Sequence, residues 1–331
     1  MIKFFTKGFF IQYAAVFILG LILWLPAILA EPVITAPDSY WGPVSVILNE
    51  LFTWLGFSGT ILAYLIIYAA GILINQMTGY YGITDRTGTL PLFLYVIISS
   101  FVQSLTILAP ATLFLPFIIL MFIIFLKHDE ENESIISSFD AGIVAGLLTL
   151  FYYPLAILVL LIWFALFTIR GISWRNYMAS FIGWTFPSFM AYAWYLFSGQ
   201  ETIFLNQIAQ IGGFHINTAF YPFSTETLLI IFVLLIIFIS ALKVMNQQKN
   251  LSIKQRNYYL IFGVYIILIL FINLFFSTGF INILLLAPAA AITLDNLLTS
   301  TIKSKWVNLA LLLFLLIIIT NSWLSFYYAV Q

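Results

Sequence analysis

The acidic residues best placed to do chemistry lie in residues 31–55, EPVITAPDSYWGPVSVILNELFTWL. This stretch holds Glu31, Asp38 and Glu50, and it contains no lysine or arginine. A carboxylate in such a setting is a candidate general acid or base. Apolar residues recur at helical spacing in its second half, which predicts a helix lying flat on a bilayer surface. A plain connector between two membrane spans is the alternative interpretation.

A second stretch, residues 198–226, carries other polar groups of interest. Its first part predicts a short surface helix that ends at two glycines, and an aromatic loop with His215 and Asn217 follows. If both stretches lie on the same side of a membrane, they could meet over a cavity. The competing interpretation is a belt of interfacial aromatic residues with hydrogen-bonding loop side chains.

The composition predicts an integral membrane protein. Of the 331 residues, 63% are hydrophobic and 7% are charged, whereas a soluble domain has about 25% charged residues. The first apolar run, residues 9–30, is longer than the apolar core of a cleaved signal peptide, and Glu31-Pro32 makes a poor cleavage site. We therefore expect one membrane domain over residues 1–331, with the first span retained.

Several classes of function are excluded by missing residues. The absence of cysteine rules out disulfides, thiolate metal sites and cysteine nucleophiles. Two histidines leave little room for a histidine-rich metal site. The sequence has no phosphate-binding loop, dinucleotide fingerprint, zinc-protease motif or serine-hydrolase motif. Binding of nucleic acid would need a basic face, and none is present.

Eleven helices are predicted at about 20 residues per span. They are residues 9–30, 58–76, 89–107, 110–126, 140–153, 154–169, 178–198, 227–243, 257–276, 280–297 and 306–328. Pro154 follows Tyr152 and Tyr153 in the middle of residues 140–169, so we expect a hairpin of two short helices that enters and leaves on one side. The fold class is therefore all-α, a polytopic transmembrane helical bundle with interfacial helices in outer loops 31–57 and 199–226.

The basic residues test this topology. With the N-terminus in the cytoplasm, the cytoplasmic segments hold all twelve: Lys3, Lys7, Arg86, Lys127, Arg170, Arg175, Lys243, Lys249, Lys254, Arg256, Lys303 and Lys305. The outer segments instead carry Glu31, Asp38, Glu50, Glu201, His215 and Glu226. Basic residues near span ends set orientation, so this split predicts a cytoplasmic N-terminus and an outer C-terminus.

Some side chains inside the predicted spans are polar, among them Asn75, Gln103, Asn273 and Asn282. Asp140 and Asp295 lie near the predicted cytoplasmic helix ends, so no carboxylate stands at the middle of a span. A proton- or ion-coupled transporter would be expected to carry one, which counts against that class. Gly142, Gly146 and Gly183 predict close packing between helices.

The layout resembles the GT-C type glycosyltransferases, membrane-embedded enzymes that take sugars from polyprenyl-phosphate carriers. Three stretches carry the resemblance: residues 31–55, with Asp38 in the place of the loop acid, residues 140–170, with a glycine-rich start, and residues 173–187. The chain as a whole also resembles an uncharacterised family of bacterial polytopic membrane proteins. These resemblances imply residence in a bacterial inner membrane.

The GT-C resemblance implies a mechanism. Asp38 would be the general base for an acceptor hydroxyl, with Glu31 and Glu50 as second choices. His215 would contact the phosphate or help an acid to hold a divalent cation, the one cofactor considered. We predict no metal ligand from the sequence itself. The remaining candidates for substrate binding are Asn217, Tyr40 and Trp41.

One feature departs from the GT-C pattern. A phosphate leaving group is normally held by arginine, lysine or a metal, and the predicted outer face has no arginine or lysine. Two alternatives therefore stay open. One is a non-catalytic membrane subunit or scaffold that docks other membrane proteins, and the other is a transporter of lipids or small molecules.

Overall fold

The structure is a computed structural model. It describes residues 2–5, 8–30, 40–45, 48, 55, 57–84, 88–101, 106, 110–130, 134–170, 173–199, 201–202, 204–205, 225–246, 251–276, 280–300 and 305–330. Within these residues the fold is all-α, as predicted, and the β structure is limited to one isolated bridge between Trp41 and Tyr152.

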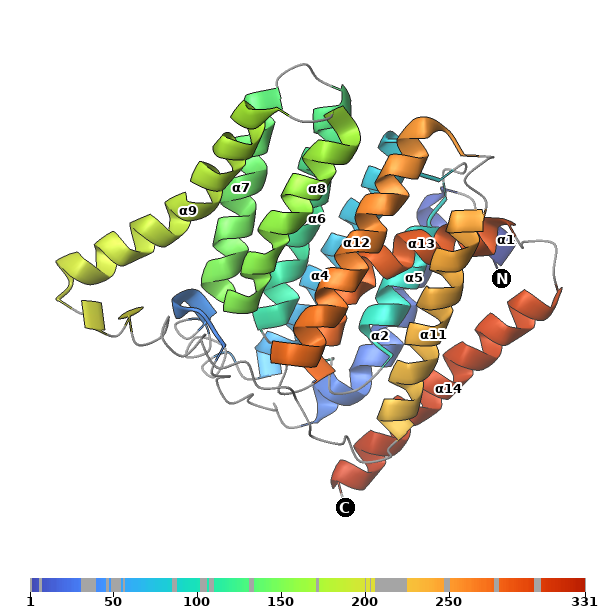
Figure 1. The fold of residues 1–331 in the computed structure, drawn as a ribbon. Coiled ribbons are helices and arrows are strands. Elements are labelled where there is room, and N and C mark those ends of the chain that lie inside the picture. Colours follow the sequence, from blue (N-terminus) through green and yellow to red (C-terminus); the bar gives the residue numbers. More distant parts are fainter. Residues whose placement is uncertain are drawn as a thin grey trace.

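Several consecutive helices pack antiparallel to one another, as α6, α7 and α8 do (Figure 1). The α-helices are α1 (Ile2–Phe5), α2 (Phe10–Leu29), α4 (Phe57–Tyr80), α5 (Leu90–Ser99), α6 (Pro110–Glu130), α7 (Ser134–Phe151), α8 (Leu158–Arg170), α9 (Trp174–Phe197), α11 (Thr225–Asn246), α12 (Ile253–Phe276), α13 (Ala287–Ser300) and α14 (Lys305–Val330). Two 3-10 helices, η2 (Tyr153–Ile157) and η5 (Phe280–Leu286), lead directly into α8 and α13.

Each of the eleven predicted spans corresponds to a helix, but some bounds were wrong. The first arm of the predicted hairpin, residues 140–153, begins earlier, because α7 starts at Ser134. The span predicted at 89–107 is only ten residues long, because α5 ends at Ser99. The Ser100 backbone N–H bonds back to Ile97, and its hydroxyl accepts a 2.8 Å hydrogen bond from the Trp24 indole. A long-range partner therefore fixes the end of α5.

A ladder of polar contacts joins α2 and α4. The hydroxyl of Tyr64 donates to the Phe17 carbonyl at 2.6 Å, and that of Tyr68 donates to the Tyr13 carbonyl at 3.0 Å. About two turns further along α4, the Asn75 amide donates to the Tyr13 hydroxyl at 2.8 Å. These bonds hold otherwise costly polar groups inside an apolar bundle.

Glycines allow α7 and α9 to pack backbone against backbone. A Cβ added at Gly142, Gly146 or Gly183 would come closer than 3.0 Å to a backbone oxygen of the facing helix. The Trp184 indole also donates to the Thr149 hydroxyl at 3.1 Å across this contact. The packing role predicted for these three glycines is confirmed.

Segments predicted to be cytoplasmic gather at one end of the bundle. The Thr89 backbone N–H donates to the Phe5 carbonyl at 2.8 Å, which ties α1 to the start of α5. The Gln255 side chain donates to the Gly82 carbonyl at 3.0 Å, which brings the start of α12 to the α4–α5 connection. The α7–α8 hairpin enters and leaves at the upper end in Figure 1, and its tip lies at the opposite end.

Candidate functional site

The tip of the α7–α8 hairpin is a defined break in the helix. α7 ends at Phe151, and Tyr152 is extended, with φ −145° and ψ 109°. Pro154 then stands in the first turn of η2, where its missing N–H is not needed. The break leaves backbone groups of residues 150–153 available for partners outside the hairpin.

Those partners come from residues 40–45. We call residues 31–57 and 199–226 the first and second outer stretches, after their predicted side of the membrane. The Gly42 N–H donates to the Phe151 carbonyl at 2.8 Å, and the Tyr153 N–H donates to the Tyr40 carbonyl at 3.1 Å. The Ser45 hydroxyl donates to the same Phe151 carbonyl at 2.6 Å. These bonds form a short antiparallel contact that fixes residues 40–45 on the hairpin tip.

A glycine is required at this contact. A Cβ added at Gly42 would come closer than 3.0 Å to both the carbonyl oxygen and the carbonyl carbon of Leu150. That neighbour is backbone of a packed helix, so it cannot move aside as a flexible side chain could. Gly42 therefore lets the first outer stretch reach the hairpin.

The end of α12 closes a second side of the site. The hydroxyl of Tyr152 donates to the Phe276 carbonyl at 2.7 Å. The ring of Tyr40 packs edge-on against the ring of Phe276, with centroids 5.5 Å apart and an interplanar angle of 85°. Three segments remote in sequence thus meet at the tip.

The end of α9 closes a third side. Tyr195, in the last turn of α9, lies near Tyr153. Phe204, at the start of the second outer stretch, packs against Tyr192 and Tyr195 with centroids 5.8 and 5.5 Å apart. We call the set Tyr40, Trp41, Tyr152, Tyr153, Tyr195, Phe204 and Phe276 the aromatic junction.

The sequence-predicted site residues divide into two groups. Tyr40 and Trp41 belong to the aromatic junction, where both are buried. Their burial makes them anchors of the first outer stretch. Five further predicted residues lie outside the described residues: Glu31, Asp38, Glu50, His215 and Asn217.

The polar residues predicted inside spans do not form one cluster in the part of the chain described. Asn75 bonds to Tyr13 on α2, whereas Asn273 bonds to the Ile269 carbonyl of its own helix at 2.9 Å. Gln103 and the side chain of Asn282 lie outside the described residues. Asp140 is exposed and Asp295 is buried.

Gly42, Tyr152 and Tyr153 were not predicted as site residues. Pro154 predicted the break between two helices, but not that the break would be a binding contact for another segment. The two tyrosines before this proline were a usable signal, because tyrosine needs a polar partner when buried. The pairing of Gly42 with the tip leaves no local signal in the sequence.

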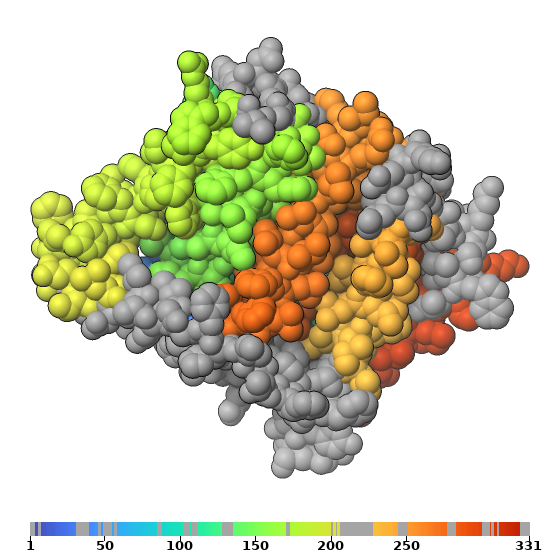
Figure 2. Space-filling model, in the orientation of Figure 1, coloured from blue at the N-terminus to red at the C-terminus, as the bar shows by residue number. Residues whose placement is uncertain are grey.

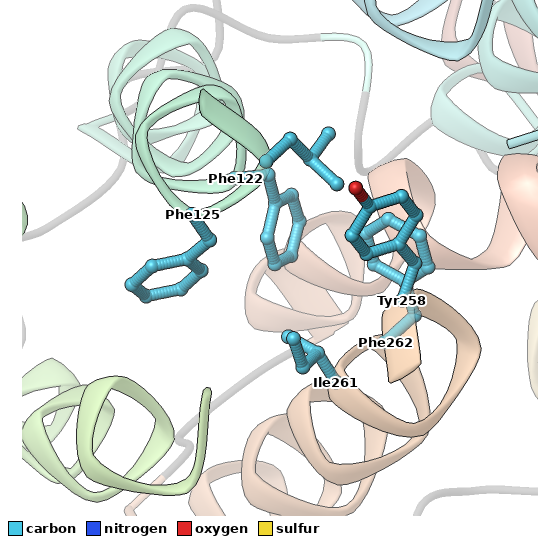
Figure 3. Close-up of a pocket in the computed structure, with 6 residues that line it drawn as sticks. Phe122, Phe125, Tyr258, Ile261 and Phe262 are labelled. Atoms are coloured by element: carbon cyan, nitrogen blue, oxygen red, sulfur yellow. The ribbon is translucent and has the colours of Figure 1, made fainter. Parts of the chain in front are cut away.

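A small cavity between α6 and α12 is a packing gap. Figure 3 shows it between aromatic side chains of the two helices. Its lining residues are Phe122, Phe125, Leu126, Tyr258, Ile261 and Phe262. Its volume of about 10 Å³ is no more than one water molecule needs, so it has no room for a substrate.

One face of α9 is covered with exposed apolar side chains. Phe189, Trp194 and Phe197 are 63%, 73% and 88% exposed. Pro187 lies inside the helix just before these residues. In Figure 2, this part of α9 extends away from α7 at the left of the molecule.

Comparison with known proteins identifies a family. The model of a family of unknown function, DUF6427, matches residues 43–329. This chain belongs to the DUF6427 family. The match includes the hairpin tip and α12, and it begins after Asp38, Tyr40 and Trp41. A search of curated proteins finds no match.

The described part of the site can bind and position, but it holds no evident base. The aromatic junction offers phenol groups, an indole and backbone groups. Within the described residues there is no group of three or more His, Cys, Asp or Glu side chains that could hold a metal ion.

Proposed function

We propose that this family member is a polytopic membrane protein that transfers a sugar from a polyprenyl-phosphate carrier on the outer face of a bacterial inner membrane. The observation that carries the proposal is the aromatic junction. It joins the first outer stretch to the hairpin tip, and the glycine contact joins the hairpin to α9. The described parts of residues 31–55, 140–170 and 173–187, the stretches on which the expected resemblance to GT-C enzymes rests, therefore lie together.

Residence in a membrane is supported by helix length and surface. By length and composition, three helices are long and apolar enough to cross a membrane: residues 10–29, 58–80 and 253–276. Seven shorter apolar helices accompany them within the described residues. Large exposed apolar side chains are also frequent on α2, α9, α11 and α14. We propose eleven spans, with the N-terminus in the cytoplasm and the C-terminus on the outer side.

The proposed chemistry uses Asp38 as the general base. Asp38 stands two residues before Tyr40, whose carbonyl is bonded to the hairpin tip, so the acid is joined to the anchor by a short piece of chain. The carboxylate takes the proton from the acceptor hydroxyl as that oxygen attacks the sugar and the carrier phosphate leaves. Glu31 and Glu50 are the other possible bases. His215, alone or with a divalent cation, balances the phosphate charge.

The test is a profile of surface glycans and lipid-linked sugars in the source bacterium. Deletion of the gene and Asp38→Asn should both deplete a glycan or accumulate its carrier. Glu31→Gln and Glu50→Gln remove the same kind of charge and test the other two possible bases. If Asp38→Asn fully rescues the deletion while Glu50→Gln does not, Glu50 is the base. A deletion strain with unchanged glycans and carriers would exclude the transferase.

A second function is favoured by the exposed aromatic face of α9. Aromatic residues are enriched at protein interfaces, so this face also suits a non-catalytic subunit that docks another membrane protein. Under that alternative, Trp194→Ala and Phe197→Ala would release a crosslinked partner without changing any glycan. A monodisperse monomer with no crosslinked partner would count against it.

A further inference from the structure

The hydroxyl of Tyr153 is a polar group without a partner at the aromatic junction. The side chain is 5% exposed, and its oxygen is buried with no hydrogen bond. Burying a hydroxyl in this state is costly to folding, and buried polar groups in folded proteins are mostly paired. An unpaired one at a candidate site is therefore a candidate for binding a ligand.

The position of Tyr153 is fixed by its own backbone. Its N–H bonds to the Tyr40 carbonyl, so the residue belongs to the contact that holds the first outer stretch. Its phenol lies near Tyr195, against which Phe204 of the second outer stretch packs. The hydroxyl thus lies where the two outer stretches are anchored to the bundle.

The chemistry around this hydroxyl suits an uncharged ligand group rich in hydroxyls. The side chains of the aromatic junction are phenols and other aromatic rings, and the two outer stretches contain no lysine or arginine. A phosphate would need positive charge, whereas a sugar ring packs on aromatic faces and accepts hydrogen bonds from phenols.

We infer that Tyr153 binds the sugar of the lipid carrier by donating a hydrogen bond to one of its oxygens. This inference rests on the proposed function and adds a binding residue to it. The phosphate and the polyprenyl chain lie elsewhere, so Tyr153 affects the recognition of the sugar and leaves that of the bare carrier unchanged.

The experiment compares full-length wild-type protein with Tyr153→Phe, each purified from the source membranes in mild detergent. Mass spectrometry measures the ratio of glycosylated to unglycosylated polyprenyl phosphate that co-purifies. We expect this ratio to fall about fivefold in Tyr153→Phe, the effect of one hydrogen bond. Tyr95→Phe is the matched control, because the Tyr95 hydroxyl on α5 is also buried without a partner, away from the junction. Its ratio should equal that of the wild type.

Thermal unfolding separates binding from a structural role. Tyr153→Phe removes an unpaired hydroxyl, so its Tm should equal or exceed that of the wild type. A lower Tm together with a lower ratio would assign the residue a structural role and overturn the inference. An unchanged ratio in Tyr153→Phe, or an equal fall in Tyr95→Phe, would also overturn it and leave the proposed function standing. Absence of any glycosylated carrier from the wild-type protein would overturn both.

Discussion

Tyr152 donates its hydroxyl to the carbonyl of Phe276 at 2.7 Å, which ties the hairpin tip to the last turn of α12. The same phenylalanine receives the edge-on ring of Tyr40 from the first outer stretch. Phe276 thus contacts Tyr152 of the hairpin tip and Tyr40 of the first outer stretch, which are the two sides of the contact that anchors residues 40–45. Loss of either contact should loosen the other.

Removing the Tyr152 hydroxyl should destabilise the protein. Tyr152→Phe leaves the Phe276 carbonyl without this donor, and we expect the free energy of unfolding to fall by about 1 kcal/mol. Thermal or denaturant unfolding in detergent micelles measures it. Tyr80→Phe is the control, because the Tyr80 ring is 76% exposed. Equal losses in both variants would contradict a specific role for the Tyr152 bond.

A methyl group at Gly42 should separate the first outer stretch from the tip. Gly42→Ala places a Cβ against the Leu150 carbonyl, and overpacking of this kind costs about 1–3 kcal/mol. Hydrogen exchange at the amides of Gly42 and Tyr153 should accelerate, because both donate across this contact.

The control for this variant lies on α4. A Cβ at Gly79 meets nothing within 4 Å, so Gly79→Ala should leave the exchange at the tip unchanged. Alanine in the helix should even stabilise the protein by about 0.5–1 kcal/mol. Unchanged exchange in Gly42→Ala would show that the close contact can relax.

Enlarging Gly146 should push α9 away from α7. Gly146→Leu places a side chain against the backbone of α9 and should break the bond between Trp184 and Thr149. The chain has no cysteine, so Thr149→Cys with Trp184→Cys gives a background-free crosslinking pair. A short bifunctional maleimide should join this pair in the parent and fail with Gly146→Leu. Gly263→Ala, on an open face of α12, should leave the yield unchanged.

The two ends of α9 should lie on opposite sides of the membrane. Trp174 and Phe197 are both strongly exposed, so a cysteine at either position can react. A membrane-impermeant maleimide should label Phe197→Cys in intact spheroplasts, and should label Trp174→Cys only after the membrane is opened. The reverse pattern would invert the orientation, and labelling of both before opening would show that α9 does not span.

The helix pattern was predictable where it depends on local composition. Long apolar runs gave all eleven helix positions, and Pro154 gave the hairpin break. The end of α5 was not predictable, because the apolar run continues past Ser99 and the stop depends on Trp24, 76 residues away from Ser100. Hydropathy therefore locates helices, whereas their ends depend on tertiary partners.

The site was less predictable than the fold. We predicted a site in residues 31–55 because of their carboxylates. The described residues 40–45 instead contribute backbone groups and aromatic rings to the contact with the hairpin tip. Gly42 looks like an ordinary loop glycine, because its requirement comes from Leu150. The sequence has 18 tyrosines. Only the three-dimensional structure shows that the Tyr153 hydroxyl is buried at the junction without a hydrogen-bond partner.

The contact between the first outer stretch and the hairpin tip also sets an order of events during synthesis. Ser45 and its acceptor Phe151 are 106 residues apart, and Tyr152 and Phe276 are a further 124 apart. At about 5–20 residues per second, the ribosome needs roughly 5–20 s to supply the first partner and a similar time for the second. Residues 40–45 therefore leave the ribosome well before their partners at the hairpin tip and cannot form this contact during that interval. We expect the nascent chain to need protection by chaperones there, because the finished protein buries Tyr40 and Trp41.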